Sequence, residues 1–529
     1  MTLLSPGAVH PDPSSFTNGV GVQDANGNSS ARPFINGNRE QSDNFLLDGM
    51  DNNQVSDNLI GYQPSPDAIE EFNMISQNAP AEFGNFMGGI VSASIKSGTN
   101  SFHGDIWEFF RNNVLNANQW ENKINPASPA LPTPPLRWNM FGGTLGGPVI
   151  KNKLFFFVDY QGQRFDHPPA EEFITIPTPA EQVGNFSALC TAGFTNGACN
   201  NPAQQIYNPC AAGTGVNGVA CQPSAATNAT RPIFPNNQIP TSMMGTVANH
   251  LFASPLYPKN INGNLSGNAL NSVGSQDNAD QGDIRADYRP SDRDQISGRF
   301  TRAFDSDPIS NSQPLLGNAL ATAPIWNVVG DWTRSISPTL VNDVRLGWNH
   351  IVLATGPTWG SNVGDFGQSI GIANSNPDGL AGLLALGLNG GTPSSVNNNG
   401  TYTIFGLSGI AQNFNTQVWQ ANDAVTWTRS RHTFKFGGEY MFNSIKTFYS
   451  GNSGELGSLI FDPNFTASSA TKTAGGVDPA GGSSLADFFL DFPSAFGRGL
   501  TTGSWTQTTN IWAGFAQDTW RFSDHLTLT

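Results

Sequence analysis

The chain has 529 residues, of which 38% are hydrophobic and 12% charged, and it contains 58 glycines and 36 prolines. This composition is too polar for a large globular core, and its aromatic content of 11% is too high for a disordered chain. The formal charge of −15 disfavours nucleic acid as a partner, because phosphates require a surplus of lysine and arginine.

A transmembrane β-barrel accommodates such a composition, since one face of each strand meets lipid while the other lines a wet lumen. A membrane-spanning helix is not predicted, because no run of about 18 apolar residues occurs. The sequence therefore indicates a mainly β protein.

Residues 1–100 have the pattern of a small, glycine-rich fold. Short strands are predicted at 44–50 and 88–98, and residues 64–75 (PSPDAIEEFNMI) are able to form a short helix capped by Asp67. Met1 is followed by TLLSPGAVHPDP, which has neither a basic start nor an apolar segment, so no signal peptide is visible. From the pattern alone, a soluble α+β domain is an equally good interpretation.

From residue 101 onward, apolar and polar residues alternate with a period of two, which is typical of strands. In the segment 153–165 (KLFFFVDYQGQRF), the residues from Leu154 to Tyr160 at even positions are apolar or aromatic, whereas Asp159, Gln161 and Gln163 occupy the other face. Hairpins with short turns repeat this design at 283–304, 330–348 and 425–443. The segments are long enough for tilted strands, which need about 9–11 residues to cross a bilayer.

We expect the apolar face of these strands to contact lipid and the polar face to line the lumen. The side chains predicted to face outward are Leu154, Phe156, Val158, Tyr160, Phe434, Phe436 and Phe442. The polar side chains predicted to face the lumen are Asp159, Gln161, Arg285, Asp287, Arg299, Arg345 and Glu439. Aromatic belts at the two membrane interfaces are expected to include Trp107, Trp332, Trp348, Trp427 and Trp512.

Three long segments rich in Asn, Gly, Pro, Ser and Thr separate the hairpins, at 166–281, 353–414 and 447–504. Structureless loops of this size would count against a compact soluble domain, but they are expected as extracellular loops of a barrel. The strands of a soluble β-sandwich also alternate apolar and polar residues. This fold explains less well, however, why tight turns and very long connections fall on opposite sides. The loops either contact a ligand or shield the surface.

The four cysteines, Cys190, Cys199, Cys210 and Cys221, all lie in the first long segment. Their spacing does not resemble that of zinc ligands, so disulfide bonds in an oxidising exterior are the better interpretation. We expect Cys190 to pair with Cys199 and Cys210 with Cys221, because this connectivity closes the shortest loops and costs the least chain entropy.

The sequence contains no convincing catalytic, metal-binding or cofactor-binding motif, so no enzyme activity and no cofactor are predicted. The glycine-rich segment 142–147 (GGTLGG) is followed by Pro148 and a strand, whereas a phosphate site requires a helix N-terminus, so we interpret it as a strand packed closely against a large neighbour. Residues 48–53 (DGMDNN) place Met50 where a calcium loop requires an oxygen ligand, and a tight turn is predicted instead. The histidines are scattered singly.

Several segments together resemble the Oar-like branch of TonB-dependent outer-membrane receptors. They are residues 32–53 (RPFINGNREQSDNFLLDGMDNN), 66–104, 107–117 (WEFFRNNVLNA) and 142–162 (GGTLGGPVIKNKLFFFVDYQG). The resemblance is close over residues 1–165 and continues beyond them as a strand pattern. It implies a 22-stranded barrel filled by a plug, with a partial plug at 1–100 and the N-terminal part of the barrel at 101–529.

The resemblance also implies a place in the outer membrane of a Gram-negative-type bacterium and transport of a bulky, unknown substrate. The energy would come from an inner-membrane TonB-type complex acting through a coupling box, which in the family precedes the position where this chain begins. We expect the plug to be held by wet, exchangeable hydrogen bonds from the lumen-facing polar residues. Alternatives are a surface adhesion or structural protein that displays its long loops, and a secreted soluble β-rich binding protein.

The resemblance further implies that this chain ends in mid-barrel. About ten to twelve barrel strands are expected from the alternating pattern. We therefore expect the segments 101–112 and 505–529 not to pair with each other, which leaves a sheet with two free edges.

Overall fold

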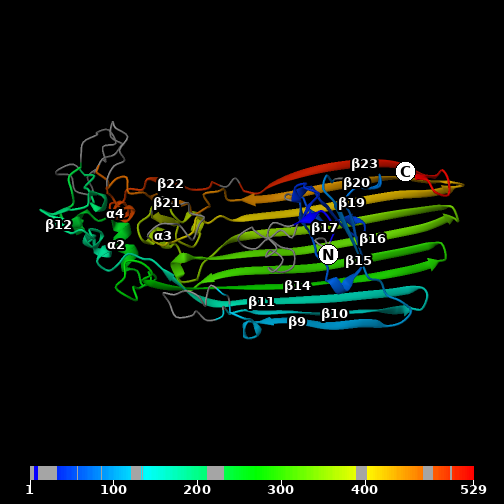
Figure 1. Ribbon diagram of the computed structural model, residues 1–529, viewed down its shortest axis with the longest axis horizontal. Coiled ribbons are helices and arrows are strands. Elements are labelled where there is room, and N and C mark those ends of the chain that lie inside the picture. The colour runs from blue at the N-terminus through cyan, green and yellow to red at the C-terminus, as the bar shows by residue number, and fades with distance from the viewer. Residues whose placement is uncertain are drawn as a thin grey trace.

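We describe residues 5–9, 33–55, 58–84, 86–118, 120, 133, 135–210, 231–388, 402–468, 481–500 and 503–529 of a computed structural model. One long antiparallel sheet dominates the molecule and curves around the N-terminal residues (Figure 1). In spatial order its strands are β9 (His103–Asn112), β10 (Arg137–Ile150), β11 (Leu154–Ile174), β14 (Ala269–Ser291), β15 (Asp294–Asn311), β16 (Asn318–Ser337), β17 (Leu340–Thr358), β19 (Gln412–Arg429), β20 (His432–Tyr449), β23 (Trp505–Arg521) and β24 (Thr527–Leu528). We call this the wall sheet.

The wall sheet has 11 strands, which agrees with the expected ten to twelve. Its edges are β9 and β24, and these two strands are not paired with each other in the part of the chain that the structure describes. The prediction that segments 101–112 and 505–529 do not pair is confirmed. None of the helices formed by the described residues has the length and apolar character needed to cross a membrane.

The strand faces follow from the period-two alternation. Tyr160 and Phe436 are each 44% exposed on the convex face, whereas the alternate residues Phe157 and Asp159 are buried on the concave face. Leu154, Phe156, Val158, Phe434 and Phe442 are partly exposed on the convex face. The predicted outward orientation is therefore confirmed.

Trp107 does not belong to an outward belt, which corrects one expectation. It pairs with Gly142, which in turn pairs with the buried Gln161, so the Trp107 side chain lies on the concave face. A Cβ atom at position 142 would lie 2.4 Å from the Trp107 ring, so the glycine makes room for the indole. The expectation that segment 142–147 packs closely against a large neighbour is confirmed at this position.

The N-terminal residues form a small sheet inside the curve of the wall sheet (Figure 1). Its strands are β4 (Met50–Asp51), β3 (Asn44–Leu47), β8 (Ile90–Ile95) and β7 (Ile69–Ile75), in this order. Two-stranded ribbons accompany it, formed by β1 (Ala8–Val9) with β2 (Phe34–Ile35) and by β5 (Asn53–Gln54) with β6 (Leu59–Ile60). We call residues 33–98 of this unit, as far as they are described, the inner domain.

The expectation of a short helix at 64–75 is wrong. Residues 66–68 form a single 3₁₀ turn, in which Asp67 makes no cap, and β7 follows from Ile69 to Ile75. The backbone of β7 pairs with β8, with Ile69 opposite Ile95 and Ile75 opposite Ile90. Pairing in a sheet satisfies the backbone groups of these β-branched residues, and it outweighs their weak helical tendency.

The long connections pack together beyond the end of the wall sheet that lies opposite the tight turns (Figure 1). They contain β12 (Phe194–Thr195), β13 (Ala198–Cys199), α2 (Thr246–Ala253), α3 (Phe366–Ser369), β18 (Ala385–Leu388), β21 (Ser458–Phe461), α4 (Ser484–Phe489) and β22 (Ala495–Gly497). We call the described parts of 175–268, 359–411 and 450–504 the loop cap. These connections are shorter than the expected 166–281, 353–414 and 447–504, because strand pairing continues through polar residues such as Glu171 and Ser272.

The loop cap has a hydrophobic core of its own. Phe186 from the first connection packs edge-on against Phe489 from the third, with ring centroids 5.7 Å apart, and Tyr257 packs against Phe405 of the second at 5.2 Å. Burying these aromatic rings joins the connections into one folded unit. Sequence patterns indicated only loops here, since the buried residues come from widely separated segments.

Candidate functional site

The contact between the inner domain and the wall sheet is centred on a tight turn. Asp48 and Gly49 connect β3 to β4 and have positive φ angles of 50° and 77°. The predicted turn at 48–53 is thus confirmed at its first residues, and Asp-Gly is a residue pair that such turns favour. A Cβ atom at Gly49 would lie 2.5 Å from Nη1 of Arg345, so the wall approaches the turn too closely for a side chain.

Arg299 of β15 holds this turn from the wall. Its Nε donates to Oδ2 of Asp48, its Nη1 donates to Oδ1 of Asp283 at 3.1 Å, and its Nη2 donates to Oδ1 of Asn327 at 2.9 Å. Tyr62 of the inner domain donates its hydroxyl to the other oxygen of Asp283 at 2.7 Å. Because Arg299 is only 4% exposed, these charge-assisted bonds are largely shielded from bulk solvent.

Arg285 of β14 forms a second anchor beside the first. Its Nη1 donates to the backbone carbonyl of Ile95 at 2.7 Å, and its Nη2 lies 3.0 Å from Oδ1 of Asp287. Asp48 also accepts a bond from the backbone N–H of Ile95 at 3.0 Å. The two arginines therefore fix β8 and the Asp48 turn as one unit.

An apolar cluster lies next to these ion pairs. Leu47, Tyr62, Ala68 and Ile95 of the inner domain pack with Phe157, Ala303, Ile325 and Ile351 of the wall. Phe157 is fully buried, although sequence reasoning assigned its face of β11 only to polar residues. The expectation of a purely wet contact is therefore wrong, because burying this apolar surface stabilises the contact as well.

Weaker polar contacts surround this centre. The backbone N–H of Asp51 donates to Oε1 of Gln420 at 2.8 Å, Gln281 donates to the carbonyl of Gln63 at 3.0 Å, and Lys435 pairs with Glu82. Burial raises the pKa of Asp51 to about 6, and hydrogen bonds from Asn53 oppose this rise only in part.

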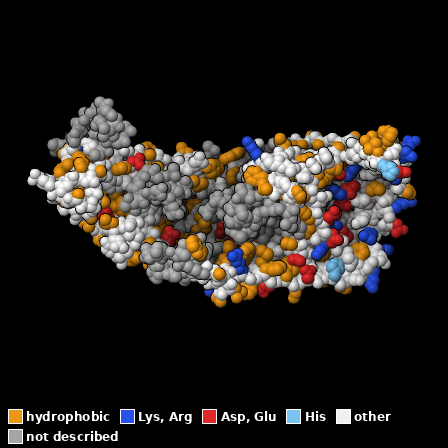
Figure 2. All heavy atoms as spheres, viewed as in Figure 1, with side chains coloured by type: hydrophobic (Ala, Val, Ile, Leu, Met, Phe, Trp, Pro, Cys, Tyr) orange, Lys and Arg blue, Asp and Glu red, His pale blue; other side chains and the backbone are white. Residues whose placement is uncertain are grey.

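A polar cavity of about 830 Å³ separates the inner domain from the wall on the side of the tight turns. Its lining is shared between the two units and carries charges of both signs, including Glu71 and Glu82 of the inner domain and Asp331, Asp343, Arg345 and Glu439 of the wall. Figure 2 shows acidic and basic side chains gathered on the concave face, toward the end of the wall sheet that carries the tight turns. Water is the natural occupant of a cavity with such a lining.

All seven residues predicted to face the lumen lie on the concave face, but they do not form one group. Arg285, Asp287 and Arg299 belong to the anchors, whereas Arg345 pairs with Asp331 at 2.8 Å and Glu439 lines the cavity. Asp159 and Gln161 are buried on β11, where Asp159 stands directly opposite Asp283. Sequence reasoning missed Asp48 and Tyr62, the inner-domain partners of Arg299 and Asp283, because long-range pairing leaves no local signal.

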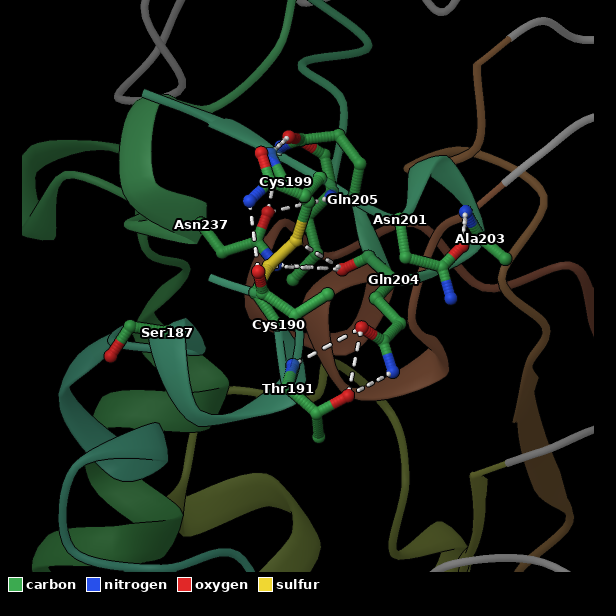
Figure 3. The surroundings of a disulfide bond; sticks show 12 residues. Ser187, Cys190, Thr191, Cys199, Asn201, Ala203, Gln204, Gln205 and Asn237 are labelled. Atoms are coloured by element: carbon green, nitrogen blue, oxygen red, sulfur yellow. Dashed lines mark hydrogen bonds between the residues drawn. A yellow bond between two sulfur atoms is a disulfide. The ribbon is translucent and has the colours of Figure 1, made fainter. Parts of the chain in front are cut away.

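A disulfide bond between Cys190 and Cys199 closes a short segment of the loop cap (Figure 3). Asn237 packs against it and donates to Sγ of Cys190 at 3.0 Å and to the carbonyl of Gln204 at 2.7 Å. The Oδ1 atom of Asn237 accepts from the backbone N–H of Ile206 at 2.8 Å. This pair is the one expected from the sequence, and Cys221 of the second expected pair, Cys210 with Cys221, lies outside the described residues.

Comparison with known proteins agrees with this architecture. Residues 94–529 match a family described as "Outer membrane beta barrel domain". The chain belongs to this family. The protein is therefore located in the outer membrane, which excludes the soluble alternative.

A stretch of 131 residues is 31% identical to the TonB-dependent transporter Oar of Myxococcus xanthus and covers 24% of this chain and 12% of that protein. This finding confirms the resemblance to Oar-like TonB-dependent receptors. Among solved structures, the outer membrane transporter YddB from Escherichia coli has a TM-score of 0.49 and 10% identity over 93% of this chain and 48% of its own. The siderophore receptor PirA from Acinetobacter baumannii has a TM-score of 0.42 and 11% identity over 98% of this chain and 53% of its own. The chain thus spans about half the length of these structures and a much smaller part of the curated relative.

Proposed function

We propose that the protein is a TonB-dependent transporter that moves a bulky substrate across the outer membrane. In this proposal, residues 1–100 belong to a plug and residues 101–529 to the N-terminal part of the barrel, with the long connections facing the exterior. An inner-membrane TonB-type complex supplies the energy by pulling on the plug. The protein acts as a carrier, and no catalytic role is assigned to any of its residues.

The contact between the Asp48 turn and Arg299 is the observation that carries this proposal. A plug must stay closed at rest and yet be released, and a compact anchor beside a wet cavity suits both requirements. Breaking the ion pairs at Asp48 exposes charges that water from the adjoining cavity can solvate. The apolar cluster around Phe157 is small enough to separate under an applied force.

A covalent tether between the inner domain and the wall tests whether movement is required. A Cβ atom at Gly347 would lie 3.4 Å from Cβ of Met50, which is close to the spacing of a disulfide bond. We expect the double variant Met50→Cys/Gly347→Cys to form this bond and to block uptake in cells whose own copy is deleted. Uptake is measured as the energy-dependent depletion of compounds from a complex medium, by mass spectrometry with and without a protonophore.

Reduction of the tether in the same cells is the matched control and should restore uptake. The single variants Met50→Cys and Gly347→Cys report the effect of the substitutions alone. Normal uptake through a fully oxidised tether would show that the inner domain does not move, and it would refute the proposal.

The folded loop cap favours one alternative function, that of a surface adhesion or structural protein. A cap with its own aromatic core presents a fixed outer surface, which suits attachment as well as ligand capture. Deletion of the gene separates the two functions. Lost uptake with normal surface attachment supports transport, whereas lost attachment with normal uptake supports adhesion.

A further inference from the structure

A row of cationic and aromatic side chains crosses the convex face of the wall sheet. Arg302 of β15 stands opposite Trp326 of β16, which in turn stands opposite His350 of β17. Because side chains alternate along a strand, these three point outward while their neighbours in the sequence are buried on the concave face. These neighbours are Thr301, Ala303, Ile325, Asn327, Asn349 and Ile351. We call Arg302, Trp326 and His350 the convex row.

The side chains of the convex row stack on one another. The central carbon of the Arg302 guanidinium lies 4.0 Å from the ring centroid of Trp326. The rings of Trp326 and His350 have centroids 4.8 Å apart and planes that differ by 16°. Nε2 of His350 lies 3.0 Å from Oδ1 of Asn415, which fixes the imidazole in this stack. The indole thus holds the guanidinium group through a cation–π contact.

Arg302 is attached to the sheet by only one of its nitrogen atoms. Its Nη1 donates to the backbone carbonyls of Ala303 and Ile325, the latter at 2.9 Å. Its Nε and Nη2 donate to no residue that the structure describes, and the ion pairs among the described residues do not include Arg302. Two donor atoms and the full positive charge therefore remain for a partner outside the described chain.

A second arginine of the convex face has such a partner within the sheet. Nη2 of Arg164 lies 2.9 Å from Oδ1 of Asp280, and the hydroxyl of Tyr160 donates to the same oxygen at 2.6 Å. Arg302 stands opposite Gly282 instead, so β14 offers it no carboxylate at the paired position. The sheet thus neutralises Arg164 but leaves the charge of Arg302 without an anion.

The convex row lies where the strands leave the hydrocarbon layer of the membrane. Counted along each strand from the end at its tight turn, Arg302, Trp326 and His350 are 8, 11 and 10 residues away. A tilted strand crosses the hydrocarbon within about 9–11 residues. Between the tight turns and the row, the same face exposes the apolar side chains of Phe300, Val328 and Leu346. The row therefore faces the lipid headgroups on the side of the loop cap.

We propose that Arg302, held on Trp326, binds the phosphate group of a membrane lipid. Nε and Nη2 form one edge of the guanidinium group, and such an edge donates two parallel hydrogen bonds to phosphate oxygens. Phe300 and Phe304, two positions before and after Arg302, are 44% and 40% exposed and offer apolar surface to the acyl chains. Lipid phosphate is the anion that an outer-membrane barrel meets at this depth.

Native mass spectrometry of the protein purified from outer membranes in a neutral detergent tests the site. We expect the wild-type protein to bind phosphatidylglycerol about tenfold more tightly than a galactosyl diacylglycerol with the same acyl chains, which lacks the phosphate. Arg302→Gln should remove this preference, and Trp326→Leu should weaken it, whereas Trp326→Phe keeps a ring under the guanidinium and should retain most of it. The control Arg334→Gln removes the same charge near the tight turns, where Arg334 already pairs with Asp294, and should keep the preference.

Three results would overturn the proposal. Equal binding of the two lipids by the wild-type protein would show that the convex face recognises acyl chains and not phosphate. Displacement of phosphatidylglycerol by an equal concentration of inorganic phosphate would indicate a site for free anions. Equal losses in Arg302→Gln and Arg334→Gln would indicate general charge attraction. The wild-type measurements decide the matter even where a variant does not fold, and they do not depend on transport, so failure here leaves the proposed function untouched.

Discussion

Arg299 illustrates how a single residue connects the inner domain to the wall. Its guanidinium group reaches Asp48 of the inner domain and Asp283 of the wall at the same time. The planar group has several donors in fixed directions, which lysine could not replace. Sequence reasoning placed Arg299 on the lumen face but had no means of naming its partners, which lie up to 251 residues away.

Removing the guanidinium tests this role. We expect Arg299→Met to destabilise the docked inner domain by about 3–5 kcal/mol, because Asp48 and Asp283 remain buried without their cation. Urea-dependent proteolysis of the inner domain in detergent measures the loss. Arg334→Met is the control, since the Arg334 side chain is 49% exposed and its pair with Asp294 contributes less than about 1 kcal/mol. Equal effects of the two substitutions would contradict the assignment.

Phe436 represents the lipid-facing residues of the wall. We expect Phe436→Arg to cost about 2–4 kcal/mol if the residue lies near the middle of the bilayer, because a charge must then be buried in hydrocarbon. Reversible unfolding from lipid vesicles measures this cost. The control variant Asp292→Arg, in an exposed tight turn, should have little effect on the free energy of unfolding. A neutral result at Phe436 would place its side chain outside the hydrocarbon layer.

At the scale of elements, the loop cap depends on α4 (Ser484–Phe489). Its Asp487 is fully buried and accepts hydrogen bonds from the backbone N–H groups of Phe465 and Thr466, each at 2.8 Å. Burial raises the pKa of Asp487 to about 7, and these hydrogen bonds and Arg231 oppose the rise only in part.

This pKa predicts how the cap responds to pH. The pKa of Asp487 is higher in the native state than in the unfolded state. Between about pH 4 and 7 the Asp487 carboxyl is therefore protonated in the native cap but ionised in the unfolded chain, so the free energy of unfolding of the cap falls as the pH rises through this window. We expect a loss of about 4 kcal/mol across it. Hydrogen exchange of residues 484–490, corrected for intrinsic rates, measures the slope. Asp487→Asn should flatten it, and Asp365→Asn, which is exposed in the same cap, should not.

The disulfide between Cys190 and Cys199 stabilises the first connection of the cap. The bond joins residues 9 apart, and closing a loop of this size contributes about 2–3 kcal/mol in the chain-entropy account. We expect Cys190→Ser/Cys199→Ser to lower the protection of residues 186–206 by this amount in hydrogen exchange. The protection of the inner domain should not change. A cap that is equally protected without the bond would show that Asn237 and its hydrogen bonds suffice.

At the scale of the whole molecule, the described residues form three separate hydrophobic clusters, one of them, around Ile35 and Phe45, at the N-terminal end of the chain. The core of the loop cap and the apolar cluster under the inner domain have no residue in common. Substitutions in separate cores should therefore have additive effects, within about 0.5 kcal/mol. We expect the same additivity when Phe488→Ala, in the core of the loop cap, is combined with Arg299→Met, in the anchor beside the apolar cluster, as measured by hydrogen exchange of each unit. A larger coupling would show that the cap and the inner domain communicate.

The sequence by itself determined the wall. Period-two alternation, turn residues and the polar or apolar character of each face are local properties, and they predicted the strand faces and the three tight hairpins. The free edges were expected from the resemblance to TonB-dependent receptors. Local reasoning was wrong at 64–75, where pairing of β7 with β8 overrides a helical pattern, and at Trp107, where Gly142 across the strand admits an indole on the concave face.

Only the tertiary structure decided which residues meet across the lumen and in the cap. Asp48 meets Arg299, Gln163 meets Asp277, and Phe186 meets Phe489 through contacts between segments far apart in the chain. Such contacts are selected by the burial of charge and apolar surface in three dimensions, and they leave no periodic pattern along the chain.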